Sequence, residues 1–159
     1  MLLSELLTTA AVIPRLKADG KRDAVAELVA VLEAAHGLDS RGEILDRVLR
    51  REAMMSTGIG NGVAIPHGKA RSVDRMMAAC AVSPVGVDFE AVDGEPAHLF
   101  ILLVSPETVG TPHVKVLANI SRLLKEESVR ENLREAGSAA DFLAALKSAE
   151  SRFLATSSP

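Results

Sequence analysis

The sequence predicts a single α/β domain in which a mixed sheet, with parallel and antiparallel strands, is flanked by helices on both faces. Apolar residues recur at helical spacing near both ends of the chain, whereas short apolar runs of strand length crowd its middle. The stretch from 62 to 104 holds several such runs and no helix long enough to cross between parallel strands. With 159 residues, 48% of them apolar, the chain has the size of one ordinary domain.

Two helices are expected in the N-terminal third. Between 21 and 36 the apolar residues fall on one helical face, and Gly37 follows as a helix stop. Ser40 and Glu43 have the spacing of a capping box, in which each side chain accepts a hydrogen bond from the backbone of the other residue. An apolar stripe that begins at Ile44 predicts the second helix.

The middle of the chain is expected to form the sheet. GVAI (62–65) is short and apolar, and MMAACAV (76–82) is long enough for a strand buried on both faces. A Ser-Pro turn then separates it from VGVDFEAV (85–92), whose alternation predicts a half-exposed strand. HLFILLV (98–104) is the most apolar run and predicts a central strand.

The C-terminal third predicts helices again. One helical face begins at His113 and is interrupted at Glu126-Glu127-Ser128, and Ser138 opens a last helix with a capping signal. We expect the domain to span residues 1–150 and residues 151–159 to form a disordered tail. The inward positions of the last helix are Phe142, Leu143 and Leu146.

Composition excludes several function classes. The net charge is −3 with mixed signs, and the only aromatic residues are four Phe, so we expect neither a nucleic-acid partner nor binding to an anionic membrane. The run 99–104 is too short to cross a bilayer, and the start, MLLSELL, lacks the basic region of a signal peptide. Cys80 is the single cysteine and cannot form an internal disulfide. These features predict a cytoplasmic protein without membrane insertion.

The stretch STGIGNGVAIPHGK (56–69) is the candidate site. Its alternating glycines permit unusual backbone shapes and let another molecule come close, while Pro66 fixes the approach to His67 and Gly68 removes bulk behind it. A lone histidine at a strand end is usually structural, but these neighbours predict an imidazole presented beside bare backbone amides. Such amides bind phosphate-like oxygens. The glycine pattern matches neither a P-loop nor a dinucleotide-binding turn.

Three further histidines are candidate partners of His67. His36 ends a helix, where a cation suits the dipole, and His98 begins an apolar strand, so we interpret both as structural or surface residues. His113 starts a helix after a central strand, which is where α/β proteins place sites. His67 and His113 could form a metal pair, although no third ligand has an obvious spacing to either.

A neutral imidazole is also a nucleophile that can take up a phosphoryl group and pass it on. This chemistry requires charge stabilisation of the phosphoryl oxygens and little else. Arg51 lies just before the glycine stretch. It is either a solvated helix-end charge or a clamp for a phosphoryl group on His67.

Arg51-Glu52 followed by STGIGNGVAIPHGK resembles the signature of the fructose/mannitol-type EIIA proteins of the bacterial phosphotransferase system. FEAVDGEPAHLFILLVSPE and HVKVLANISRLL resemble the family's central region and its second-histidine helix, and the resemblance extends from about residue 3 to about residue 147. It implies that Nε2 of His67 is phosphorylated, that Arg51 borders the site and that His113 is the second active-site histidine. It implies no cofactor and no metal.

The resemblance also suggests a branch and its partners. In the mannitol branch an acidic residue stands six positions before the histidine; here that position is Asn61, which is more similar to the nitrogen-related branch, EIIA(Ntr). We therefore expect a stand-alone phosphocarrier that accepts its phosphoryl group from an HPr- or NPr-type carrier and regulates target proteins. Cys80 lies in an apolar run and resembles core more than an EIIB-type phosphocysteine.

Three alternatives stay open at this point. The first is a fructose/mannitol-type EIIA that passes its phosphoryl group to a separate EIIB for sugar uptake. The second is a metal-dependent hydrolase that uses His67 and His113. The third is an interaction module whose histidine is never phosphorylated.

Overall fold

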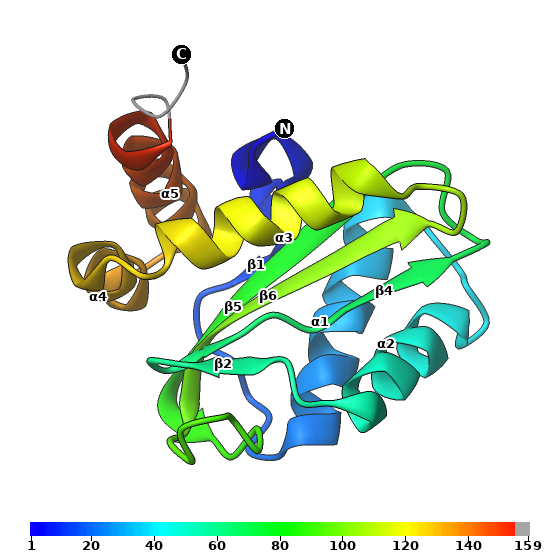
Figure 1. The fold of residues 1–159 in the computed structure, drawn as a ribbon, viewed down its shortest axis with the longest axis horizontal. Helices are drawn as coiled ribbons and strands as arrows, with labels where there is room; N and C mark the ends of the chain where they lie inside the picture. The colour runs from blue at the N-terminus through cyan, green and yellow to red at the C-terminus, as the bar shows by residue number, and fades with distance from the viewer. Residues whose placement is uncertain (155–159) are drawn as a thin grey trace.

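Six strands form one mixed sheet in the computed structural model, which describes residues 1–154 (Figure 1). The strand order is β1-β5-β6-β3-β2, and β4 also pairs with β6. β5 and β6 are antiparallel, β1 runs parallel to β5, and both β3 and β4 run parallel to β6. The predicted mixed sheet is therefore confirmed. The strands are β1 (Val12–Ile13), β2 (Gly58–Gly60), β3 (Val63–Ala64), β4 (His67–Ala70), β5 (Met77–Val87) and β6 (Ala97–Pro106).

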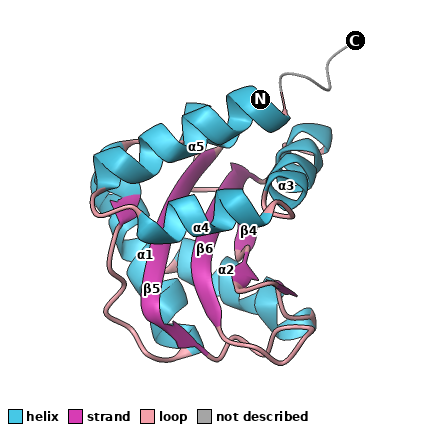
Figure 2. Cartoon of the chain, turned by 90° about the vertical axis from the view of Figure 1, so that its left-hand side faces the viewer, coloured by secondary structure: helices cyan, strands magenta, loops and turns pink. Residues whose placement is uncertain are grey.

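Helices cover both faces of this sheet, as predicted. α1 packs on β5 and α2 on β4, while α4 contacts β5 and β6. Figure 1 shows α1 behind the central strands and α3 crossing in front of them, and Figure 2 shows α4 running across β5 and β6. Every residue from 77 to 83 and from 99 to 105 is buried, as expected for strands covered on both sides. The helices are α1 (Lys21–His36), α2 (Glu43–Met54), α3 (Thr111–Leu123), α4 (Glu127–Glu135) and α5 (Ala139–Phe153), preceded by two short 3-10 turns (Leu3–Leu6 and Thr9–Ala11).

The predicted division of 76–92 into two strands is wrong. β5 continues through the Ser-Pro dipeptide as one strand of 11 residues, and its register with β6 shifts between Val82 and Val87. This irregularity accommodates Pro84, which has no N–H to donate to the ladder. Phe89 lies beyond the strand and is fully buried.

The predicted capping box is also wrong. α2 begins after Gly42, which has a left-handed φ of 84°. The hydroxyl of Ser40 donates to Glu33 and accepts from the N–H of Ile44, not from that of Glu43, and the carboxylate of Glu43 accepts from the backbone N–H groups of Arg71 and Ser72. Both side chains therefore bond to groups outside the box.

The C-terminal helices follow the prediction closely. The helical pattern breaks between α3 and α4, and the Ser138 hydroxyl accepts from the N–H of Asp141 at the start of α5. Phe142 and Leu146 are buried, whereas Leu143 is only half-buried. α5 continues three residues past the expected domain end at 150, and the rest of the expected tail, 155–159, lies outside the described residues.

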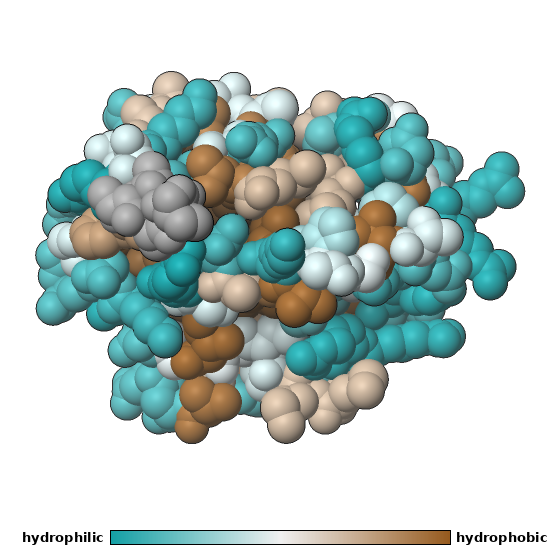
Figure 3. Space-filling view, turned by 45° about the horizontal axis from the view of Figure 1, so that its top comes forward, coloured by the Kyte–Doolittle hydropathy of each residue, from teal (hydrophilic) through white to brown (hydrophobic). Residues whose placement is uncertain are grey.

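Apolar residues on the surface are dispersed. Figure 3 shows one face on which hydrophilic residues separate small hydrophobic patches. Within residues 1–154, no helix combines the length and the apolar character needed to span a membrane.

Candidate functional site

His67 is the first residue of β4, and the neighbouring elements hold it in place. It pairs with Leu103 of β6, and α2 packs against the strand. The close packing depends on Gly68, because a Cβ at that position would lie 3.2 Å from Val48. The imidazole is therefore half-buried beside α2.

The hydrogen bond at Nδ1 determines the tautomer of His67. Nδ1 lies 2.8 Å from the carbonyl oxygen of Ile65. Since a carbonyl oxygen can only accept, Nδ1 carries the proton and Nε2 keeps its lone pair. Burial, and to a lesser degree the charge of Arg51, lowers the pKa of His67 below its ordinary value. At neutral pH the ring is a neutral nucleophile through Nε2.

A buried ion pair supports this arrangement from behind. Glu52 is 5% exposed, pairs with Lys21 at 3.0 Å, and accepts from both the N–H and the hydroxyl of Thr57. The carbonyl of Thr57 accepts from the N–H of Ile65, whose own carbonyl holds His67. An unbroken series of ion-pair and hydrogen-bond contacts therefore links Lys21 to the imidazole of His67. We did not predict this from the sequence, although Glu52 adjoins Arg51 in the motif.

The glycines before His67 pack against the protein itself, contrary to the expectation that they leave room for a partner. A Cβ on Gly58 would lie 2.9 Å from Ala91, and one on Gly60 would lie 3.2 Å from the carboxylate of Asp93. Gly60 also has a φ of 91°, which side-chain-bearing residues rarely adopt. Val92 donates its N–H to the carbonyl of Gly58. Gly58 and Gly60, the two glycines of β2, are thus packed against residues 91–93.

We therefore predict that Gly58→Ala lowers the free energy of unfolding by about 1–3 kcal/mol, the usual effect of overpacking. The new methyl group would meet the backbone and side chain of Ala91, which cannot move aside as a flexible side chain would. Urea unfolding followed by circular dichroism measures the change. Gly137→Ala is the matched control, because a Cβ there meets nothing within 4 Å. Equal stability of the two variants would contradict the prediction.

His113 comes close to His67 although 46 residues separate them in the chain. It is the third residue of α3, only 6% exposed, and its ring centroid lies 5.5 Å from that of His67 with the planes tilted by 58°. Nδ1 of His113 lies 2.6 Å from Oγ of Ser105. Burial, followed by the charges of His67 and Lys69, lowers the pKa of His113 to about 4. Both histidines are therefore neutral at pH 7.

The two rings line a cavity of about 410 Å³ whose charged residues are all cationic. Arg51 donates to the carbonyl of Met55 at 2.8 Å, and Arg50 pairs with Asp46 on the neighbouring turn of α2. Lys69 has no ion pair within residues 1–154. The excess positive charge suits a phosphoryl group. The lining residues are Arg47, Arg50, Arg51, Met54, His67, Gly68, Lys69 and His113.

The structure brings together the three residues predicted for the site, His67, His113 and Arg51. Lys69 was missed, although its position two residues after His67 in a strand puts both side chains on one face. His98 bonds the carbonyl of Ser83 at 2.9 Å instead of joining the site.

His36 ends α1 and also lies outside the site. Cys80 is fully buried, and burial raises the pKa of its thiol far above the ordinary value. This is the environment of an inert core residue.

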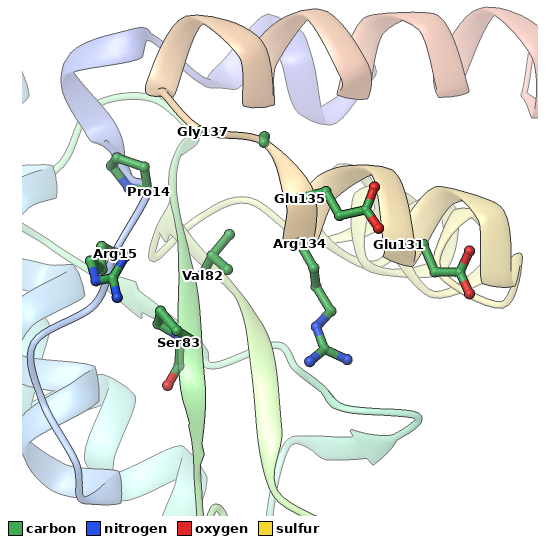
Figure 4. Close-up of a pocket in the computed structure, with 10 residues that line it drawn as sticks. Pro14, Arg15, Val82, Ser83, Glu131, Arg134, Glu135 and Gly137 are labelled. Atoms are coloured by element: carbon green, nitrogen blue, oxygen red, sulfur yellow. The ribbon is translucent and has the colours of Figure 1, made fainter.

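A separate groove of about 620 Å³ lies between the end of β1, β5 and the α4–α5 connection (Figure 4). Arg15, Arg134, Glu131 and Glu135 are among the residues that line it, and all four side chains are exposed. None of the predicted site residues lines it. Its charges are balanced, unlike those of the histidine cavity.

For the metal-dependent alternative, the structure supplies the pair His67 and His113. Within residues 1–154, no group of three or more His, Cys, Asp or Glu side chains could hold a metal ion. A structural or catalytic zinc site usually takes three or four protein ligands. The geometry therefore fits phosphoryl transfer better than metal-assisted hydrolysis.

Known proteins resemble this chain over most of its length. A nitrogen regulatory protein of Bradyrhizobium diazoefficiens is 37% identical over 134 residues, which is 84% of this chain and 87% of that protein. The fructose-specific EIIABC component of Bacillus subtilis is 38% identical over 138 residues, or 87% of this chain, but the chain spans only 22% of that protein. The crystal structure of nitrogen regulatory protein IIA-Ntr from Neisseria meningitidis superposes with a TM-score of 0.83 at 30% identity, covering 90% of this chain and 97% of that one.

The family model for the EIIA 2 component of the phosphoenolpyruvate-dependent sugar phosphotransferase system matches residues 5–149. The matched residues include His67, His113, Arg51 and the whole sheet. The chain therefore belongs to the EIIA type 2 family of the phosphoenolpyruvate-dependent sugar phosphotransferase system.

Proposed function

We propose that the chain is a cytoplasmic histidine phosphocarrier that accepts a phosphoryl group on Nε2 of His67 from an HPr- or NPr-type carrier. It then acts on regulatory target proteins according to its phosphorylation state. The observation that supports this most strongly is the bond from Nδ1 of His67 to the Ile65 carbonyl. This bond leaves Nε2 as the nucleophile, in a cavity with four cationic side chains.

In the proposed step the lone pair of Nε2 attacks phosphorus. A new N–P bond forms as the N–P bond to the donor's histidine breaks, and the donor's nitrogen recovers its electron pair. The phosphoryl oxygens carry the negative charge throughout, so catalysis consists of positioning and charge stabilisation. Arg51 acts as a clamp, His113 donates a hydrogen bond, and Lys69 contributes positive charge.

Exposed apolar residues beside the cavity fit contact with a carrier protein. Met54 is 82% exposed and Met55 70% exposed at the end of α2, and Val114 adjoins His113 on α3. Exposed apolar residues grouped beside a polar site are typical of docking surfaces. Val63 and Ile65, which precede His67 in the motif, are buried and do not belong to this surface.

The regulatory role is supported by the nitrogen regulatory relative, which aligns along most of both chains. The second candidate function is delivery of the phosphoryl group to an EIIB for sugar uptake. It is supported by the 38% identity to the fructose-specific component. The two candidates share the first step and differ in the acceptor that follows.

The test is reconstitution from purified parts. Incubation with enzyme I, an HPr- or NPr-type carrier and phosphoenolpyruvate should add one acid-labile, base-stable phosphoryl group per chain, seen in the intact mass. A reaction without the carrier is the control. Onward transfer to a fructose- or mannitol-type EIIB would favour sugar uptake, and its absence would favour regulation. A chain that neither carrier phosphorylates would refute the phosphocarrier proposal.

We predict that Arg51→Lys slows phosphoryl transfer about tenfold and leaves the melting temperature nearly unchanged. The guanidinium can hold the Met55 carbonyl and still present N–H groups to a phosphoryl oxygen, whereas lysine offers one point charge. A hydrogen bond to a charged group contributes roughly 1.5–3 kcal/mol, of which part would be lost. Quenched-flow phosphorylation measures the rate.

Arg50→Lys is the matched control for this prediction. Arg50 lines the same cavity but is 74% exposed and paired with Asp46. If Arg51→Lys transferred at the unmodified rate, Arg51 would be a helix-end charge only.

A further inference from the structure

Ser105 is placed to act on the second histidine. It lies near the end of β6, opposite Lys69 of β4, and is fully buried. The loop that follows returns the chain to the start of α3, so that Oγ of Ser105 comes within 2.6 Å of Nδ1 of His113. This is a short hydrogen bond between two buried side chains.

The bond can be made in two ways, and they have opposite consequences. If Nδ1 of His113 donates to Ser105, Nε2 is a bare acceptor that would repel phosphoryl oxygens. If the hydroxyl of Ser105 donates to Nδ1, the neutral ring carries its proton on Nε2 and becomes a donor. Because His113 is neutral at pH 7, with a pKa of about 4, one of the two arrangements must hold.

Hydrogen-bond satisfaction decides between them. Within residues 1–154, His113 is the only hydrogen-bond partner of the Ser105 hydroxyl. If Nδ1 were the donor, the hydroxyl proton would be buried without an acceptor, which costs about 1–3 kcal/mol. If the hydroxyl donates, its proton is satisfied. The second arrangement is therefore the stable one.

The remaining ring nitrogen faces the cavity. Nε2 of His113 has no hydrogen-bond partner within the described residues. Only two side-chain polar atoms among these residues are both inaccessible to solvent and without a partner, Nε2 of His36 and Oε1 of Glu150, so Nε2 of His113 is accessible. Since Nδ1 is turned to Ser105, the edge that lines the cavity beside His67 is the Nε2 edge.

We infer that Ser105 is a positioning residue that holds His113 as the Nε2–H tautomer, so that His113 donates a hydrogen bond to the phosphoryl group in transit to or from His67. The hydrogen bond from His113 to a phosphoryl group rests on the proposed phosphocarrier function, whereas the Nε2–H tautomer of His113 does not. Ser105 touches no reacting atom and acts only through His113.

The first experiment tests the tautomer without any phosphoryl transfer. Long-range ¹H–¹⁵N NMR of the unmodified protein at neutral pH should show His113 as a single Nε2–H tautomer and His67 as the Nδ1–H tautomer. In Ser105→Ala we expect the His113 signals to move toward an average of both tautomers. An Nδ1–H tautomer of His113 in the unmodified protein would overturn the inference.

The second experiment measures transfer. Ser105→Ala should slow phosphorylation of His67 by a carrier about tenfold, because the His113 ring would lose its anchor, and Ser105→Thr should restore most of the rate. Ser83→Ala is the matched control, since Ser83 is equally buried on β5 and its Oγ accepts from the N–H of Gly86. A native rate in Ser105→Ala would also overturn the inference.

The two proposals fail separately. If the protein accepts phosphoryl groups but His113 carries its proton on Nδ1, the inference is wrong and the phosphocarrier function stands. If no carrier phosphorylates the protein, the function fails, and the NMR result alone decides the tautomer.

Discussion

Replacing His67 with alanine should abolish phosphorylation of the protein by enzyme I, a carrier and phosphoenolpyruvate. His67 is the one histidine whose Nε2 combines a free lone pair with the cationic cavity, because its Nδ1 proton is committed to the Ile65 carbonyl. His113 does not replace it, since its Nε2 carries the proton. Labelling followed by intact mass should give no added phosphoryl group.

His98→Ala is the matched control for this experiment. His98 is also half-buried, and its Nδ1 also bonds a backbone carbonyl, that of Ser83, but it lines no part of the cavity. The His98→Ala protein should be labelled normally. Acid-labile label that persists in His67→Ala would place the phosphoryl group elsewhere and end the proposal.

Replacing His113 with alanine should slow transfer about a hundredfold without preventing it. The loss of one preorganised donor to developing charge typically costs about 3 kcal/mol of transition-state stabilisation. His67 would keep its tautomer, because the Ile65 carbonyl is independent of His113. Labelling should therefore reach the same end point more slowly, and discharge to the next acceptor should slow as well.

His113→Gln provides the comparison for His113→Ala. Its amide can donate a hydrogen bond from a similar position, so part of the lost rate should return. Unchanged transfer in both directions for the alanine variant would show that His113 is structural.

Local patterns predicted much of the fold. The helix stop at Gly37 and the cap at Ser138 are properties of a few adjacent residues, and both were correct. The break between two helices was also correct, although it lies at 124–126 and not at 126–128. The buried strand near 98–104 was equally clear from its apolar run. Two predictions were wrong, the capping box at Ser40 and the turn at the Ser-Pro dipeptide. In both cases a group from another part of the chain changed the local backbone or side-chain conformation. Glu33 takes the hydroxyl of Ser40, and β6 keeps β5 extended past Pro84.

The site was predicted only in part for the same reason. His67 could be recognised because its motif is continuous, and Arg51 because it borders that motif. The glycines were expected to leave room for a partner, which was wrong. Their contacts with 91–93 come from a segment about 30 residues later and cannot be read from the motif.

The sequence by itself determined the fold class, the family resemblance and the identity of the three proposed site residues, because helical spacing, strand-length apolar runs and the histidine motif are all short-range signals. Only the tertiary structure decided that the rings of His67 and His113 lie 5.5 Å apart. It also decided which nitrogen of each ring is free, through the Ile65 carbonyl in one case and the Ser105 hydroxyl in the other. Tautomers depend on the partner of a single hydrogen bond, and the position of a partner from another element is known only once the chain has folded.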